Sequence, residues 1–174
     1  GFETLFVPRP IPDDPYADPD FGAEWVESWR DRSGPRSGFG EEEDALLAAE
    51  IESLSCLESL FSVGDVSCCT IEPYQCEGGD VSPTRRYFHA LRALTKAYDI
   101  PLIFDEVQSG FGLSGEALFW YTLLGLDEAP DIVCGAKRGQ VGYVISRWPD
   151  PAPDAAHAAR AVRGLTNVRA VTES

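Results

Sequence analysis

The stretch VSCCTIEPYQCEGGDVSPTRRYFHALRALTKAYDIPLIFD, residues 66–105, decides the fold of this 174-residue chain. It opens with a short apolar, β-branched run at 66–71 and closes with another apolar run at 101–105. Between them, apolar side chains recur every three or four residues over 84–98, which predicts an amphipathic helix. A strand, a helix and a second strand in this order are typical of parallel strands joined by a right-handed crossover. The stretch therefore predicts an α/β fold with a mostly parallel sheet and flanking helices.

Weaker patterns extend this alternation on both sides. Before the stretch, apolar spacing predicts a short helix over 23–30 and a longer one from Glu41 to about residue 61. After it, we expect a helix over 116–124, strands over 132–134 and 143–146, and an Ala-rich helix over 152–163.

Composition divides the chain into three parts. Residues 1–40 are an irregular lead-in rich in Pro and Gly, because proline is poorly tolerated in helices and in central strands. Residues 41–148 are predicted to hold the α/β core, and residues 149–174 a helical tail.

Charge and residue usage exclude several classes of function. The chain carries 29 Asp and Glu against 14 Lys and Arg, a net charge of −15, which disfavours nucleic acid and anionic membranes as partners. No apolar run approaches the roughly 18–20 residues of a membrane span. Five Cys without a CxxC pair favour reduced thiols and a cytoplasmic location, and His89 and His157 lack partners at metal-ligand spacing. Because the chain begins with Gly1 and contains no Met, we expect a segment of a longer reading frame.

Three segments follow the predicted strands, at the edge of the sheet where ligands bind in α/β proteins. They read IEPYQCEGGD at 71–80, FDEVQSGFGLSG at 104–115 and PDIVCGAK at 130–137. In order and spacing they resemble the motifs of the class III aminotransferases, pyridoxal-phosphate enzymes of fold type I. The resemblance implies pyridoxal 5'-phosphate as cofactor, a homodimer, and transfer of an amino group from an ω-amine to a 2-oxo acid such as 2-oxoglutarate. The segments GQVG at 139–142 and LSG at 113–115 resemble the lysine 6-aminotransferase branch.

Lys137 is the candidate Schiff-base lysine. The chain has only two lysines, and Lys96 falls within the predicted helix, where a solvated surface charge is the simplest interpretation. Lys137 instead follows an apolar strand and matches the family's lysine. Asp105 ends the preceding strand, and the resemblance assigns its carboxylate to the ring nitrogen, whose proton makes the cofactor an electron sink.

The resemblance also assigns roles to residues around this pair. Val107 packs on the ring face and Gln108 reaches the ring's phenolic oxygen. Glu72 and Glu77 match the two glutamates of the family's first motif, and the second gates a substrate-binding arginine. Thr166 falls near the position of a phosphate-binding Thr. Glu106 is predicted to have a structural role only.

Three alternatives stay open at this point. The chain could be a truncated segment without catalysis, which binds the cofactor weakly because the family's phosphate loop lies upstream of the first motif. It could belong to an aminomutase or a decarboxylase, relatives that share the lysine and the aspartate. A nucleotide-binding domain ranks last, since no P-loop is present.

Overall fold

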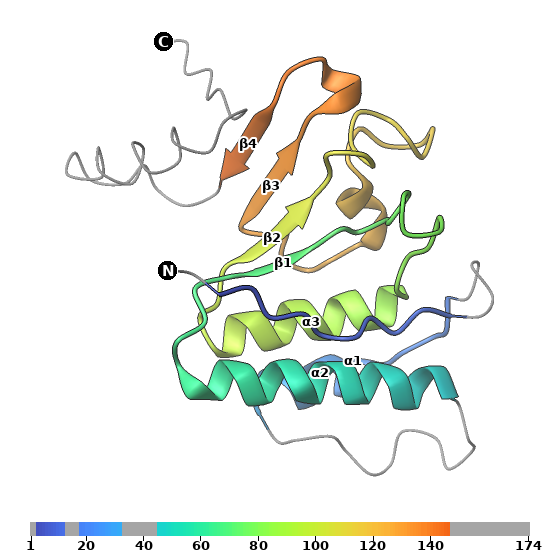
Figure 1. Cartoon of the computed structure of the whole chain (residues 1–174). Coiled ribbons are helices and arrows are strands. Elements are labelled where there is room, and N and C mark those ends of the chain that lie inside the picture. The colour runs from blue at the N-terminus through green and yellow to red at the C-terminus, as the bar shows by residue number, and fades with distance from the viewer. Residues whose placement is uncertain (1–2, 13–17, 33–44, 147–174) are drawn as a thin grey trace.

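The computed structural model describes residues 3–12, 18–32 and 45–146. Helices, strands and 3-10 helices alternate along these residues (Figure 1). In chain order they are α1 (Ala23–Arg30), α2 (Ala45–Val63), β1 (Cys69–Ile71), α3 (Arg85–Ala97), β2 (Leu102–Asp105), η1 (Trp120–Leu124), β3 (Ile132–Gly135), η2 (Lys137–Gly139) and β4 (Tyr143–Ser146).

The four strands form one sheet in the order β1-β2-β3-β4. β1, β2 and β3 are parallel, while β4 runs antiparallel to β3. The prediction of a mostly parallel α/β sheet with flanking helices is therefore confirmed. The expected parallel pairing of the strands at 66–71 and 101–105 is confirmed too. In the described sheet, however, β1 lies at the edge rather than in the centre.

Local chemistry explains where α3 begins and ends. The Thr84 hydroxyl accepts a hydrogen bond from the Tyr87 N–H (3.1 Å), which satisfies one of the unpaired donors of the first turn. At the other end, Asp99 adopts a left-handed conformation (φ 55°), and Pro101 precedes β2. These signals restrict α3 to the connection between β1 and β2.

The described helices α1, α2 and α3 lie on one side of the sheet (Figure 1). Leu102 and Phe104 of β2 point towards them, and the ring of Phe104 meets that of Phe88 at 5.6 Å. The largest fully buried side chains are apolar and come from α1, α2, α3 and β2: Trp25, Trp29, Leu54, Phe88, Leu91, Leu94, Leu102 and Phe104. The core therefore sits between this helical layer and one face of the sheet.

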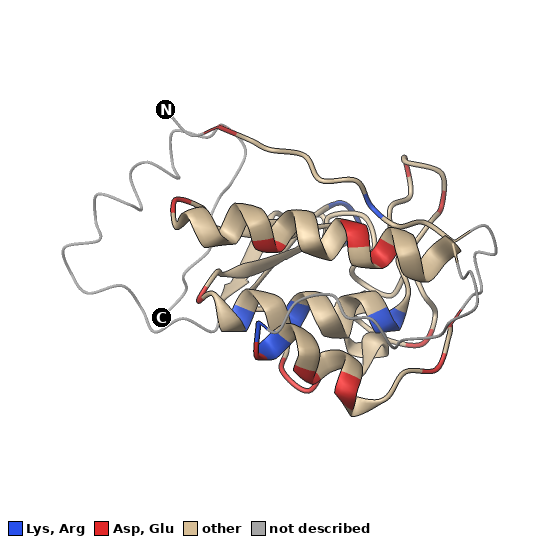
Figure 2. Ribbon diagram, turned by 90° about the horizontal axis from the view of Figure 1, so that it is seen from below, with Lys and Arg blue, Asp and Glu red and all other residues tan. Residues whose placement is uncertain are grey.

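The helices carry complementary charges. All charged residues of α2 are acidic and all those of α3 are basic (Figure 2). At their contact, Glu50 is fully buried and accepts hydrogen bonds from Arg86 Nε (2.6 Å) and the Thr84 hydroxyl (2.5 Å). The Trp25 indole of α1 donates to the Arg86 carbonyl (2.9 Å), so this buried ion pair links all three helices.

Two predicted elements need comment. The predicted helix over 116–124 is wrong, because only Trp120–Leu124 is helical, as a 3-10 turn, and Phe119 before it is extended. The helix over 23–30 is confirmed with the same bounds. The predicted start of α2 at Glu41, the helix over 152–163 and the tail 149–174 lie outside the described residues.

Among the described helices, none combines the length and the apolar character that crossing a membrane would require.

Candidate active site

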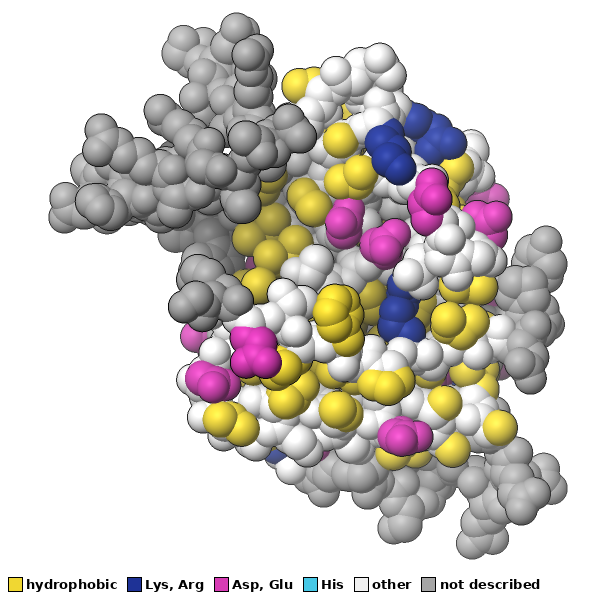
Figure 3. All heavy atoms as spheres, viewed as in Figure 1, with side chains coloured by type: hydrophobic (Ala, Val, Ile, Leu, Met, Phe, Trp, Pro, Cys, Tyr) yellow, Lys and Arg dark blue, Asp and Glu magenta, His cyan; other side chains and the backbone are white. Residues whose placement is uncertain are grey.

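The carboxyl ends of the three parallel strands meet at one edge of the sheet. The register pairs Ile71 with Phe104, and Asp105 with Cys134, so the segments that follow β1, β2 and β3 emerge side by side. On the face of the molecule shown in Figure 3, basic and acidic side chains gather at this end. The edge therefore brings the three sequence motifs together, as the sequence predicted.

Asp105 is the last residue of β2 and is half-buried. Side chains alternate along a strand, and since Phe104 faces the helices, Asp105 faces the opposite side of the sheet. One carboxylate oxygen, Oδ1, accepts a hydrogen bond from the Val107 N–H (3.0 Å), which fixes the orientation of the group. Burial, followed by the charge of Asp105, raises the pKa of the neighbouring Cys134 thiol to about 11. Cys134 therefore stays a neutral thiol beside this carboxylate.

Lys137 and Gln108 contact each other across two strand ends. The Lys137 amine donates a hydrogen bond to the Gln108 side-chain oxygen Oε1. The next residue, Arg138, donates to the Gln108 carbonyl (2.9 Å), so both turns are held together. Lys137 is exposed and has a left-handed backbone (φ 42°), a conformation that residues other than glycine rarely adopt. Such strain is often found at functional sites.

The segment after β1 lies beside the lysine turn. Burial raises the pKa of the Cys76 thiol, as do Asp80 and Glu72, while the nearby positive charges of Arg138 and Lys137 act to lower it. Glu72 is half-buried, and its carbonyl accepts a hydrogen bond from Arg9 Nη2 (2.8 Å).

The two remaining residues of the predicted site are Glu77 and Thr166. Glu77 is exposed in the turn after β1. Thr166 lies outside the described residues.

Glu106, next to Asp105, has a different environment. Its carboxylate is fully buried and accepts hydrogen bonds from the N–H groups of Trp120 (2.7 Å) and Tyr121 (2.8 Å). Burial raises the pKa of Glu106, although these hydrogen bonds act against the shift. The carboxylate caps the first turn of η1, a contact that supports a structural role.

Sequence reasoning missed three residues that build this edge. Arg9 comes from the proline-rich lead-in, where no periodicity marks a contact with the sheet. Arg138 could have been noticed as a second cation beside Lys137. The sequence pattern predicts Tyr143 only as part of a strand, yet its ring lies against Gly135 and Gly110 at the site.

The donor set fits pyridoxal phosphate. A carboxylate on one strand end, an amine on the next and an amide between them match the ring nitrogen, the aldehyde and the phenolic oxygen of that cofactor. Gln108 uses Oε1 for Lys137, which leaves its Nε2 as a donor. Within the described ranges, no group of three potential metal ligands (His, Cys, Asp, Glu) occurs.

Known proteins resemble this chain over most of its length. A family model described as aminotransferase class-III matches residues 33–152. The chain belongs to the class III aminotransferases. The match spans the segments that follow β1, β2 and β3, including Lys137 and Asp105.

Individual class III relatives match the same region. The L-lysine-epsilon aminotransferase of Mycobacterium bovis is 39% identical over 129 residues, which are 72% of this chain and 28% of that protein. The acetylornithine aminotransferase of Vibrio cholerae is 34% identical over 130 residues, 74% of this chain and 31% of that protein. The solved lysine aminotransferase from M. tuberculosis has a TM-score of 0.56 and 40% identity, covering 65% of this chain and 25% of that chain. The chain thus spans less than a third of the length of these relatives.

Proposed function

We propose that these residues form the cofactor-binding part of a pyridoxal-phosphate-dependent aminotransferase. The proposed reaction moves an amino group from an ω-amine, of the kind found in lysine, to a 2-oxo acid such as 2-oxoglutarate. The observation that carries the proposal is the contact of Lys137 with Gln108 at the strand edge that also bears Asp105. Relatives named lysine and acetylornithine aminotransferase support an ω-amine donor.

In this proposal Lys137 attaches the cofactor through its amine. When bound, pyridoxal phosphate supplies an electron sink for negative charge that develops on the substrate carbon next to the nitrogen. The left-handed turn at Lys137 and the hydrogen bond to Gln108 orient the amine towards the strand edge. The same amine, once free, is placed to carry a proton to or from the substrate carbon.

Asp105 holds the proton on the ring nitrogen. Its Oδ1 already accepts from the Val107 N–H, so the carboxylate is oriented before the cofactor arrives. Val107 is half-buried and would pack on the ring face, and the Gln108 amide Nε2 would donate to the phenolic oxygen. We expect the Asp105 carboxylate and the Lys137 amine to be separated by the pyridine ring and its bond to the lysine.

Glu72 and Glu77 complete the proposed site after β1. Arg9 anchors the Glu72 carbonyl, which fixes the start of this segment at the strand edge where the cofactor would bind. Glu77 is exposed, so its side chain is free to turn towards a substrate-binding arginine, as the gating role requires. Thr166 is proposed as a phosphate contact in a homodimer. A cytoplasmic location belongs to the same proposal.

The decisive experiment compares the two lysines of the chain. The experiment uses a longer protein that contains this chain together with phosphate-binding and substrate-binding segments. In that protein, Lys137→Ala should abolish the visible absorbance of the cofactor and transamination together. Asp105→Ala retains part of the absorbance and lowers turnover by roughly a thousandfold, as expected when a positioned charge is lost. Lys96→Ala is the matched control and keeps both signals. Absorbance and turnover that survive Lys137→Ala would contradict the proposal.

The chain alone gives a second measurement. We expect weak binding of pyridoxal phosphate, because phosphate contacts from outside these residues contribute much of the affinity. Reduction with borohydride followed by peptide mapping would then label Lys137 and Lys96 without strong preference. Selective labelling of Lys137 would show that this chain alone suffices to hold the cofactor.

A further inference from the structure

We infer that Tyr143 is a positioning residue for Lys137: its ring supports the turn that presents the lysine amine to Gln108. The inference rests on the proposed function, since it concerns how the cofactor lysine is held. The first observation is the backbone of the turn. Lys137 (φ 42°) and Gln140 (φ 57°) both have left-handed conformations. Two such residues close together persist only where their surroundings hold them.

Tyr143 lies directly against the strand that leads into this turn. It pairs with Gly135 in the antiparallel register of β3 and β4. A Cβ atom added at Gly135 would overlap the Tyr143 hydroxyl, so this position accepts only glycine while the ring is in place. A Cβ at Gly110 would lie 2.9 Å from the same hydroxyl. The ring therefore reaches from β4 past β3 to the segment after β2.

Phe111 connects Tyr143 to the lysine turn itself. The two rings meet edge to face, with centroids 5.3 Å apart. A Cβ added at Gly139 would lie 3.2 Å from the Phe111 ring, so the turn rests on that ring. On another side, Phe119 lies 6.1 Å from Tyr143. Tyr143 thus belongs to an aromatic cluster with Phe111 and Phe119, and Phe111 of this cluster supports the lysine turn.

The ring, rather than the hydroxyl, carries this role. Within the part of the chain that the structure describes, the buried Tyr143 hydroxyl has no hydrogen-bond partner. Burial raises the pKa of this phenol, and the nearby Glu106 carboxylate adds to the effect, so it stays neutral. A phenylalanine offers the same ring to Phe111 and Gly135. The conservative variant should therefore preserve the position of Lys137.

The test measures the reactivity of the two lysines without any cofactor. The chain is treated with a limiting amount of acetic anhydride, and acetylation of Lys137 and Lys96 is quantified by peptide mass spectrometry. In Tyr143→Ala, we expect the ratio of Lys137 to Lys96 acetylation to change by about threefold, as the hydrogen bond to Gln108 is lost. Tyr143→Phe keeps the wild-type ratio. Lys96 lies on α3 and serves as the internal reference in every sample.

A second variant covers the case in which Tyr143→Ala does not fold. Gly139→Ala keeps the whole aromatic cluster but places a methyl group against Phe111, which displaces the turn. It should shift the acetylation ratio in the same way while leaving the far-ultraviolet circular dichroism unchanged. A wild-type ratio in the folded alanine variants overturns the inference. Because no cofactor is used, that result would leave the proposed role of Lys137 to be judged by the Lys137→Ala experiment alone.

Discussion

The helical layer and the strand edge differ in whether their charged side chains are buried and in where their backbones are left-handed. In the helical layer, Glu50 and Arg86 are buried as a hydrogen-bonded pair, and the surrounding aromatic rings are almost fully enclosed. At the strand edge, Lys137 and Arg138 are exposed, and four residues other than glycine have left-handed backbones: Asp80, Phe111, Lys137 and Gln140. In the helical layer a left-handed residue such as Asp99 ends a helix, whereas at the strand edge such residues lie in the turns that carry the candidate site.

This difference separates stability from chemistry in the molecule. A residue that holds helices together should affect unfolding strongly and the site only indirectly. A residue that presents a reactive amine in a strained turn should do the reverse, because strain at a site is maintained by contacts elsewhere. Substitutions in the two regions can therefore be ranked by their expected effect on the free energy of unfolding.

The largest effect is expected when the buried ion pair is broken. Arg86→Met leaves the Glu50 carboxylate buried without its cation and should lower the free energy of unfolding by about 3–5 kcal/mol. Urea unfolding of the chain, followed by circular dichroism, measures the loss. The double variant Glu50→Leu with Arg86→Met removes both charges and should recover most of it. Equal stability of the single variant and the wild type would show that the pair is not a structural centre.

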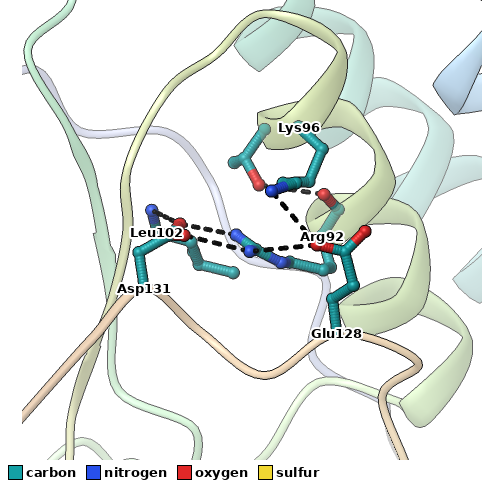
Figure 4. Close-up of polar contacts among 6 residues, drawn as sticks. Arg92, Lys96, Leu102, Glu128 and Asp131 are labelled. Carbon is teal, nitrogen blue, oxygen red and sulfur yellow. Dashed lines mark hydrogen bonds and ion pairs between the residues drawn. The ribbon is translucent and has the colours of Figure 1, made fainter. Parts of the chain in front are cut away.

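A smaller effect, dependent on pH, is expected at Asp131. Its carboxylate accepts hydrogen bonds from Arg92 (2.6 and 3.1 Å) and from the Leu102 N–H (2.9 Å), and Arg92 also faces Glu128 (Figure 4). Burial acts to raise the pKa of Asp131, but the bonds and charge of Arg92, with the Leu102 bond, hold it below its usual 3.8. Its stabilisation is therefore complete above pH 3.8 and is lost as the pH falls further. Asp131→Asn should cost about 2 kcal/mol at neutral pH.

Glu106 at the strand edge should show the opposite sign. Burial raises the pKa of this carboxyl above its usual 4.5, so its ionised form is disfavoured in the folded chain. The folded state should gain stability from Glu106 as the pH falls through the folded pKa towards 4.5. Free energies of unfolding measured against pH for wild type, Asp131→Asn and Glu106→Gln isolate each contribution. Parallel curves for all three proteins would contradict both assignments.

The smallest effects are expected when a lysine is replaced by glycine, once in each region. Lys137→Gly relieves the left-handed backbone and should change the free energy of unfolding by about 0.5–1 kcal/mol, in the stabilising direction. Lys96→Gly, in the last turn of α3, should instead destabilise by about 1 kcal/mol, because glycine disfavours the helix and the cation near its C-terminus is lost. Urea unfolding of the pair measures both signs. Destabilisation of similar size at both positions would remove the contrast between the regions.

Regular elements could be predicted from the sequence because their signals are local. The apolar runs at 66–71 and 101–105 contain β1 and β2, and the cap at Thr84 marks the start of α3. The helix predicted over 116–124 failed because its shape depends on a distant group. Glu106 holds the N–H groups of Trp120 and Tyr121, and that contact produces a short 3-10 turn. No periodicity within 116–124 carries this information.

Site residues could be predicted only where they fall within a motif of the family. Lys137, Asp105 and Gln108 follow from the resemblance, and the structure brings Lys137 and Gln108 into contact. Whether Asp105 and Lys137 flank one ring-sized space stays a prediction. Arg9 and Tyr143 act through contacts between segments far apart in sequence, so neither propensity nor spacing indicates them.

The contact of Arg9 with Glu72 also bears on the order of assembly. These residues are 63 positions apart, and the segment they join still needs Gln108 and Lys137 to complete the edge. Contacts between such distant segments close long loops and form slowly compared with helices. During synthesis from the amino end, α1, α2 and the turn after β1 are made well before Lys137. The strand edge can therefore acquire all its contacts only after Lys137 has been added to the growing chain.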